Sequence, residues 1–287
     1  MRSIEFPKSG DVDFTVDNRP VFTLDNTGEY MRLKKHRANV RTDTDSLLGI
    51  VGKGYGTMQN DVLLNSFLPY IDAASGIPVS NGSFNGGESV YWQYKTGTCE
   101  VGNDQIDEYI LLAGSHGGSL PNLFMRTFVR VWCSNTFQAA VKGCKNKFSV
   151  KHTKNGVDNW LKASAVMAQD AKYANKFFDL LNQLSSKKID GNVLQEFIRR
   201  LMPAKNEQKV HTKTRKNREL VQQAFEESPG SKRESLYDAY NGATQYIDHM
   251  RRLKGEDEGH SRFVASNFGS GVALRDHAFR VAVQLIG

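Results

Sequence analysis

The hydrophobic periodicity of this chain changes near residue 150, and that change constrains the fold more than any other feature. Before it, short apolar runs alternate with polar residues or stand between Gly and Asn clusters. From about residue 156 onward, apolar residues recur every three or four positions. Period-two patterns favour strands and 3.6-residue patterns favour helices. We therefore predict an α+β protein, in which an antiparallel β-rich part with interspersed helices (residues 1–150) precedes a mainly helical part (residues 151–287).

Turn sequences divide the first part into strands. Asp25-Asn26-Thr27-Gly28 and Asn85-Gly86-Gly87 each separate two strand-like runs, as the turn of a β-hairpin does. A helix is predicted over residues 60–74, and a short helix is predicted to begin at Ser134 or Asn135 and to run through Val141. The strand-like runs cover residues 19–24, 30–40, 47–51, 79–84, 89–94, 108–113 and 123–133.

The second part is predicted as a series of helices. The apolar series from Trp160 to Leu184 gives a long first helix, and a second helix is capped by Asp190 and stopped by Pro203. Residues 205–218 have no apolar period, so we predict a basic loop that leads into the next helix. Two later helices are predicted within residues 236–250 and 272–286, with an acidic loop at 255–259 between them.

Composition places the chain among folded globular proteins. Hydrophobic residues make up 39% and charged residues 24%, which argues against global disorder. No run approaches the roughly 18 to 20 apolar residues of a membrane span, and the first residues lack the apolar segment of a secretory signal. Three cysteines (Cys99, Cys133 and Cys144) without C-x-x-C spacing favour free thiols in a reducing compartment. We expect a soluble, cytoplasmic protein that contacts no membrane.

Positive charge is concentrated in one stretch of the sequence. Residues 141–218 hold 18 Lys and Arg against 6 Asp and Glu, a net charge of +12. Residues 1–140 carry a net −3 and residues 219–287 a net −2. Such asymmetry indicates a polyanionic partner, with nucleic acid the first candidate and an anionic membrane the second. The alternative is a set of lysine-rich helix faces that contact only solvent.

Aromatic rings and cations alternate in two of the predicted strands, around residues 91–95 and 126–130. An open sheet face of this kind suits single-stranded nucleic acid, because bases stack on the rings while cations contact the phosphates. The alternative is that these rings belong to the core and that the arginines are their buried partners. The predicted stacking residues are Tyr91, Trp92 and Tyr94, and the predicted phosphate contacts are Lys95, Arg126, Arg130, Lys142, Lys145, Lys147, Lys151 and Lys154.

The sequence predicts no catalytic residues, no metal site and no cofactor. The glycines of residues 52–56 fit neither phosphate-binding pattern, and Ser115-His116 lacks the strand–turn–helix frame of a catalytic serine. Two loose sets of metal-binding residue types lack the spacing of a zinc site, namely Asp248, His249 and His260, and Cys133, Cys144 and His152. Binding without covalent catalysis is therefore the expectation, and a nuclease with dispersed carboxylates stays an alternative.

Several segments, in this order and spacing, resemble a known family. They are Leu48-Gly49-Ile50-Val51-Gly52 with Tyr55 and Gln59-Asn60, Val129 to Thr136, His152-Thr153, Tyr240 to Thr244 with Tyr246 to His249, and Phe268-Gly269. Over roughly residues 19–287 they are similar to the phage- and plasmid-borne family of domain of unknown function 932. The resemblance implies a role in replicating, repairing or protecting the DNA of mobile elements, and it supplies no established catalytic residues. The N-terminus here is shorter than in the longer members.

The order of the predicted elements is similar, more weakly, to the core of the Rad52-like single-strand annealing proteins. That similarity implies binding of the DNA backbone in a basic groove and assembly into rings or helical filaments. We accordingly expect a phage or plasmid protein that binds and anneals single-stranded DNA in recombination, as a ring or filament homo-oligomer in the host cytoplasm. A host-interacting counter-defence protein, a metal-dependent nuclease and a structural phage protein are the alternatives.

Overall fold

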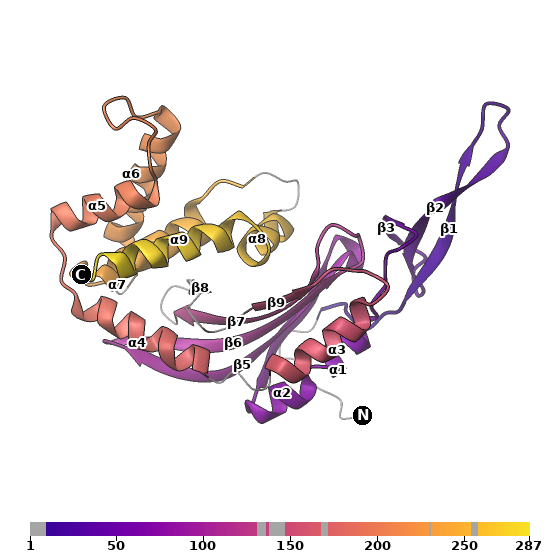
Figure 1. Cartoon of the computed structure of the whole chain (residues 1–287), viewed down its shortest axis with the longest axis horizontal. Helices are drawn as coiled ribbons and strands as arrows, with labels where there is room; N and C mark the ends of the chain where they lie inside the picture. Colours follow the sequence, from indigo (N-terminus) through magenta and orange to yellow (C-terminus); the bar gives the residue numbers. More distant parts are fainter. Residues whose placement is uncertain (1–9, 131–135, 138–146, 168–171, 230, 254–257) are drawn as a thin grey trace. The chain divides into compact units, whose positions relative to one another are not determined.

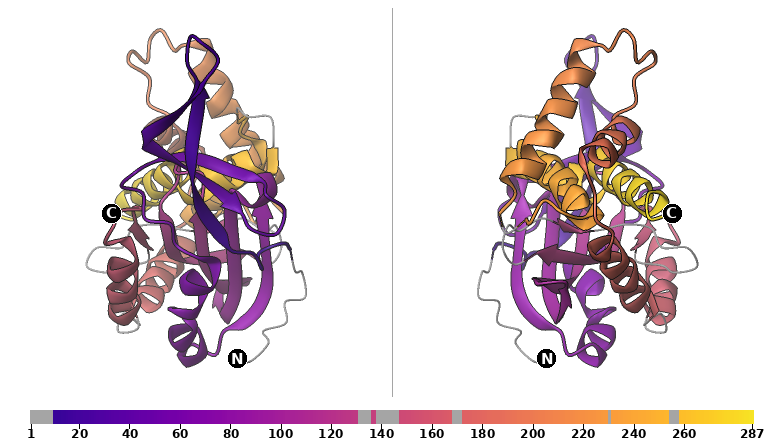
Figure 2. Two further views of the ribbon diagram at one scale, coloured as in Figure 1. Left: turned by 90° about the vertical axis from the view of Figure 1, so that its right-hand side faces the viewer. Right: turned by 90° about the vertical axis from the view of Figure 1, so that its left-hand side faces the viewer.

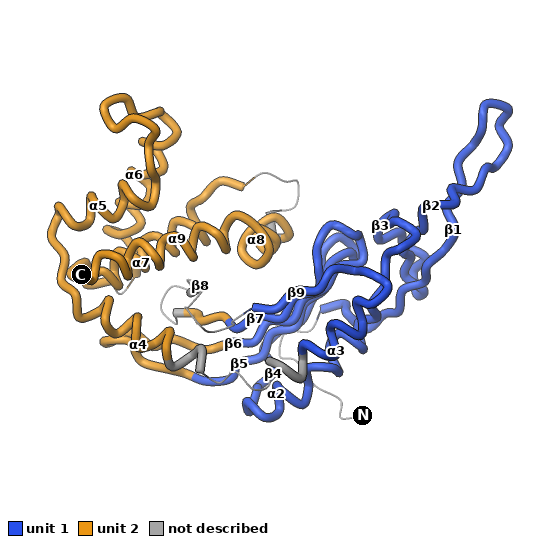
Figure 3. The backbone as a smooth tube through the Cα atoms, in the orientation of Figure 1, with its two compact units in different colours: residues 1–97, 109–126, 147–170 blue, residues 98–108, 127–146, 171–287 orange. Residues whose placement is uncertain are grey.

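The computed structural model describes residues 10–130, 136–137, 147–167, 172–229, 231–253 and 258–287. The chain is α+β, as predicted, with its strands in the first half and most of its helices in the second (Figure 1). Two compact units interleave along the sequence (Figure 3). Unit 1 comprises residues 1–97, 109–126 and 147–170, and unit 2 comprises 98–108, 127–146 and 171–287. The sequence predicted a single boundary at residue 150. The two units instead alternate along the chain, because single long strands contribute residues to both units.

The first strands form a three-stranded antiparallel sheet in the order β1-β2-β3, comprising β1 (Val16–Leu24), β2 (Tyr30–Arg41) and β3 (Leu47–Gly52). The predicted hairpin is confirmed. Asp25 Oδ1 accepts hydrogen bonds from the amides of Thr27 and Glu29, at 2.8 and 2.9 Å, and closes the turn. Strand β3 pairs only with residues 36–40 of β2, so the twisted outer part of the β1–β2 hairpin extends beyond β3 (Figures 1 and 2). We call residues 20–35 the arm.

A second, six-stranded sheet has the order β4-β5-β6-β7-β8, with β9 also pairing β7. Its strands are β4 (Ile77–Phe84), β5 (Ser89–Val101), β6 (Asp104–Ser115), β7 (Asn122–Arg130), β8 (Thr136–Phe137) and β9 (Lys147–Val150). β5 and β6 are longer than the apolar runs predicted, and Gly102, with a φ of 59°, lies in the turn between them. The short helix predicted from residue 134 or 135 is wrong at Thr136 and Phe137, because both pair with β7. The rest of that segment lies outside the described residues.

The core of unit 1 lies between this sheet and three helices, α1 (Asn60–Asn65), α2 (Leu68–Ala73) and α3 (Gly156–Met167). Phe67 stacks on Phe124 with ring centroids 4.5 Å apart, and Trp160 of α3 packs on Phe67 at 4.8 Å. The single helix predicted over residues 60–74 is interrupted after Asn65. Pro69 accounts for the interruption, since it lacks an amide to continue the helical hydrogen bonds and fits best in a first turn.

Unit 2 is mainly helical. Its helices are α4 (Lys172–Ser186), α5 (Gly191–Leu201), α6 (Thr212–Glu227), α7 (Leu236–Gln245), the π-helical turn η2 (Tyr246–Met250), α8 (Glu258–Asn267) and α9 (Ser270–Gln284). The predicted cap of α5 is confirmed, because Asp190 Oδ1 accepts from the amide of Val193 at 2.9 Å. The predicted basic loop is shorter than expected, since α6 already begins at Thr212. Phe177, Tyr240 and Phe279 lie in the buried core.

A buried ion pair joins three elements of unit 2. Arg275 of α9 is fully buried and donates to the carboxylate of Asp248, which lies in η2. Arg275 also donates to the carbonyl of Ser266 in α8, at 2.5 Å. Asp248 belongs to one of the loose metal-binding sets, and here its carboxylate is held by an arginine. Among the helices whose residues are described, none has the length and apolar character needed to cross a membrane.

Candidate functional site

The structure corrects two of the three predicted stacking residues. Trp92 and Tyr94 are 2% and 1% exposed and belong to the core of unit 1, together with Leu63 and Phe67. The alternation of β5 turns both side chains toward the helices, so neither ring is open to a base. Tyr91 lies on the other face of β5, is half-buried, and stacks on Phe84 with ring centroids 5.7 Å apart. The core alternative therefore holds for Trp92 and Tyr94.

The predicted phosphate contacts are not brought together on one described surface. Arg126 is buried with its guanidinium 5.9 Å from the centre of the Tyr70 ring, so it is a buried partner rather than a phosphate contact. Lys95 and Lys147 are half-buried, and burial lowers the pKa of Lys147. Lys151 and Lys154 are exposed. The side chain of Arg130 and the whole of Lys142 and Lys145 lie outside the described residues.

The arm carries several cations, although residues 1–140 taken together have a net charge of −3. Strand β2 contains five Lys and Arg and no Asp or Glu. Arg41, at its inner end, is paired with Asp11 and Asp43 at 2.5 and 2.6 Å. Arg32, Lys34 and Lys35 are exposed and form no ion pair with any described residue. A charge count over β2 alone could have found them from the sequence.

The arm also exposes large apolar side chains. The register places Phe22 opposite Arg32 and Leu24 opposite Tyr30, and residues directly opposite in an antiparallel pair share a face. Phe22, Leu24 and Tyr30 are 51%, 59% and 83% exposed. Side chains two positions apart on a strand also share a face, so Arg32 continues the face that begins at Tyr30. We call Phe22, Leu24, Tyr30 and Arg32 the arm face.

A second concentration of positive charge lies in unit 2, from the end of α5 to the first turns of α6. Residues 199–218, which we call the basic segment, hold eight Lys and Arg and one Asp or Glu, a net charge of +7. That one carboxylate, Glu207, pairs with Arg218 through bonds of 2.6 and 2.8 Å. The hydrogen bonds from Arg218 lower the pKa of Glu207 to about 2. Arg199 and Arg200 pair with Glu196 of α5.

Four lysines of the basic segment have no such partner in the described chain. Lys205, Lys209, Lys213 and Lys216 are all exposed, and the last two lie in the first turns of α6. The first turn of α6 contains no acidic residue, and the N-cap His211 makes no side-chain cap. Cations at a helix N-terminus oppose the positive end of the helix dipole. A bound polyanion would relieve this repulsion, so the segment is electrostatically suited to an anionic ligand.

Unit 1 contains two nearby histidines, of which His116 is buried and His152 is half-buried. His116 follows β6, and its Nε2 lies 2.9 Å from Oδ1 of Asn60 at the start of α1. Burial, and secondarily the nearby His152, lower the pKa of His116 to about 4. The ring of His152 stacks on Tyr55 at 4.6 Å, and the Tyr55 hydroxyl donates to the carbonyl of Ser115 at 2.7 Å. These contacts join segments that are far apart in the sequence.

The arrangement around His116 supports a structural role. The imidazole contacts the Asn60 amide, while the Ser115 hydroxyl accepts a 3.3 Å bond from the amide of Gly117, so serine and imidazole do not form a nucleophile–base pair. A Cβ atom on Gly49 would lie 2.7 Å from Cα of Gly117, which shows how closely β3 approaches the loop after β6. No group of three or more His, Cys, Asp or Glu suited to a metal ion occurs among the described residues.

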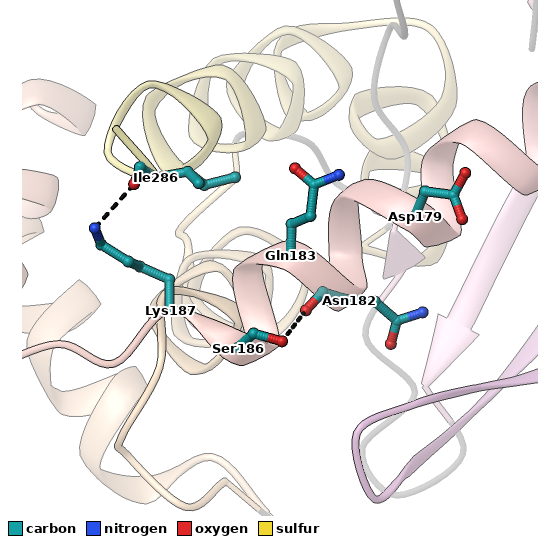
Figure 4. A pocket seen from close by; sticks show the side chains of 6 residues that line it. All are labelled: Asp179, Asn182, Gln183, Ser186, Lys187 and Ile286. Carbon is teal, nitrogen blue, oxygen red and sulfur yellow. Dashed lines mark hydrogen bonds between the residues drawn. The ribbon is translucent and has the colours of Figure 1, made fainter.

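Unit 2 also has an open surface pocket of about 590 Å³ (Figure 4). It lies beside α4 and the end of the chain. Lys187 Nζ donates to the carbonyl of Ile286, and Ser186 Oγ donates to the carbonyl of Asn182, both at 2.9 Å. The lining thus combines polar groups, two of them already bonded, with one carboxylate, that of Asp179.

The comparisons with known proteins agree with the resemblance seen in the sequence. A family model described as domain of unknown function (DUF932) matches residues 47–267, well over half of the chain. The chain belongs to the DUF932 family. The match begins at the first residue of β3, so the arm of this DUF932 protein lies outside the matched residues and the basic segment lies within them. No curated protein and no solved structure matches the chain.

Proposed function

We propose that this DUF932 protein binds single-stranded DNA and anneals complementary strands, in the recombination of phage or plasmid DNA. The observation that carries the proposal is the basic segment, where Lys205, Lys209, Lys213 and Lys216 are exposed and the one carboxylate is already paired with Arg218. Because ordinary solvated helix faces mix both signs of charge, a run of twenty residues with a net +7 favours a polyanion over solvent alone.

Lysines suit the chemistry that annealing requires. They contact phosphates as point charges without reading sequence, and each phosphate contact releases condensed counterions. A strand held by its backbone keeps its bases available to a complementary strand. Pairing of complementary strands then needs no nucleophile and no cofactor.

Self-association completes the proposal. Four lysines on one chain contact few phosphates, and screened contacts of this kind give weak affinity. Repetition of the basic segment around a ring or along a filament lets one strand contact many copies, so the effective concentration of each later contact is high. We therefore propose a homo-oligomer that acts in the cytoplasm of the host cell.

The test replaces Lys205, Lys209, Lys213 and Lys216 together with Gln. The matched control replaces four exposed lysines outside the basic segment, Lys162, Lys176, Lys188 and Lys232, with the same change in charge. Binding of a fluorescent oligothymidylate is measured from about 50 to 300 mM salt. For five to eight phosphates neutralised, the slope of log Kobs against log salt is about −3.5 to −6 in the wild type, and four lost contacts make it shallower by about 2.8.

The control variant should keep the wild-type slope, and the wild type should accelerate pairing of two complementary labelled strands. Equal slopes for the two quadruple variants would remove the basic segment from the interface. No binding by the wild type at about 50 mM salt would refute the proposed function as a whole and leave a host protein as the better partner.

A further inference from the structure

We propose that the arm is a stacking element, whose arm face takes the bases of single-stranded nucleic acid. The inference rests on the proposed function and adds to it. The basic segment explains affinity for phosphates in unit 2, whereas the arm face combines rings with cations in unit 1. Nothing in the family match covers the arm, because the match begins at Leu47.

The first argument is that the arm exposes side chains that a free hairpin has no reason to expose. A two-stranded ribbon is marginally stable in water unless a third strand or a helix covers it. β3 stops at a pairing with His36, and the outer half of β2 pairs only with β1. Phe22, Leu24 and Tyr30 are each more than half exposed there. Apolar side chains gathered at such a place indicate a surface that is covered by a ligand.

The second argument is the order of side chains along the arm face. The strand register places Leu24 opposite Tyr30 and Phe22 opposite Arg32. The aromatic Phe22 and the aliphatic Leu24 of β1 therefore share a face with Arg32, the first cation of β2. Lys34 and Lys35, both exposed, follow in β2 where the register with β1 shifts. Every base has a π-face that stacks on a ring, and every nucleotide adds a phosphate for a cation. The arm face therefore repeats, over a few residues, the two contacts that single strands need.

The third argument concerns the occupant. A membrane is disfavoured because the turn at the end of the arm carries Asp25 and Glu29, and hydrogen bonds from Thr27 and Glu29 lower the pKa of the Asp25 carboxylate. Insertion of the arm into a bilayer would dehydrate this acidic tip, whereas a strand that lies along the arm face leaves the tip in water. The stem behind the tip contains no Asp or Glu between Tyr30 and Arg41, which matches a continuous polyanion.

The test uses two faces of the same hairpin. One variant is Phe22→Ala with Tyr30→Ala, on the arm face. The matched control is Thr23→Ala with Met31→Ala, a pair aligned on the opposite face, where Met31 is also half exposed. Each full-length protein is titrated with an oligothymidylate and with an abasic oligonucleotide of the same length, which keeps the phosphates but lacks the bases. Melting temperatures confirm that all variants fold.

The wild type and the control should bind oligothymidylate more tightly than the abasic strand. The arm-face variant should lose about tenfold per ring for oligothymidylate, little for the abasic strand, and should keep the wild-type salt slope. Variants of the basic segment should show the reverse, with a changed slope and an unchanged preference for bases. This contrast separates the two proposals.

Equal affinity and equal base preference in the two hairpin variants would overturn the stacking role while leaving the proposed function intact. Light scattering on the same proteins supplies the other decisive result. If the arm-face variant dissociates an oligomer but binds both oligonucleotides as the wild type does, the arm takes a second copy of the chain and the stacking proposal is wrong. Absence of any binding by the wild type overturns both proposals.

Discussion

His116 is held neutral by its surroundings, and a neutral buried imidazole makes stability depend on pH. Burial and the nearby His152 lower its pKa from the ordinary 6.5 to about 4. In the unfolded chain the same ring takes up its proton near pH 6.5. Between these values the unfolded state binds more protons than the folded state, so the free energy of unfolding falls as the pH falls. The contribution is fully present above about pH 6.5.

We expect the free energy of unfolding, measured with urea, to fall by about 2 kcal/mol as the pH falls from 6.5 to 4.5. Replacement His116→Gln keeps a polar group toward Asn60 but cannot be protonated, so it should flatten this dependence. Carboxylates such as Glu207 lose their contribution only below about pH 4.5, outside this window. The exposed His36→Gln is the control, and an unchanged pH dependence in His116→Gln would contradict the explanation.

Two helices of unit 2 begin near an aspartate, and the two aspartates differ in burial and in the number of hydrogen bonds that they accept. Asp190 is exposed and caps α5 through one amide, that of Val193. Asp238 lies in the first turn of α7, is buried, and forms a reciprocal capping box with Ser235. The carboxylate of Asp238 also accepts from the amide of Glu234 and from the hydroxyl of Ser231. Loss of this carboxylate would leave the buried amide and hydroxyl of Ser235, and the partly buried donors of Ser231 and Glu234, without their acceptor.

We therefore expect Asp190→Ala to lower the free energy of unfolding by about 1 kcal/mol, the usual cost of a lost cap. Asp238→Ala should cost on the order of 3 to 4 kcal/mol, since each buried donor left unpaired costs about 1 to 3 kcal/mol. Chemical denaturation of both variants measures the difference. Equal losses at the two sites would mean that solvent satisfies the amides around Asp238 as readily as those at α5.

Most helices, strands and turns could be predicted from the sequence, whereas the burial or exposure of their side chains could not. Hairpins, the cap at Asp190 and the stop at Pro203 depend on local backbone chemistry, which the sequence carries directly. Tyr91, Trp92 and Tyr94 were all predicted to stack on bases, although alternation along a strand places Tyr91 on the face opposite Trp92 and Tyr94. The sequence does not say which of these faces is covered. The cover over Trp92 comes from distant segments that include Trp160 of α3. For the same reason the arm was predicted as an ordinary hairpin, because exposure depends on where β3 ends.

At the scale of the molecule, the proposals require more than one copy of the chain. We expect light scattering to give a multiple of the monomer mass of 32.2 kDa at low salt, and a larger particle when a long single strand is added. Avidity then accounts for tight binding by a few lysines per copy. A monomer at every salt and DNA concentration would contradict this expectation and would favour a host protein as the partner of the basic segment.

Because the two units alternate along the sequence, unit 1 is completed during synthesis only after two segments of unit 2 have been made. A ribosome delivers the first 97 residues of unit 1, then alternates between the units, and supplies the last segment of unit 1 only with residues 147–170. Until α3 has been synthesised, Phe67 and Phe124 lack the indole of Trp160, which packs on Phe67 in the finished core. A nascent chain of this protein therefore cannot complete the core of unit 1 until residue 160 has been added. No single cut in the gene separates the two units, because any fragment that encodes all of one unit also encodes segments of the other.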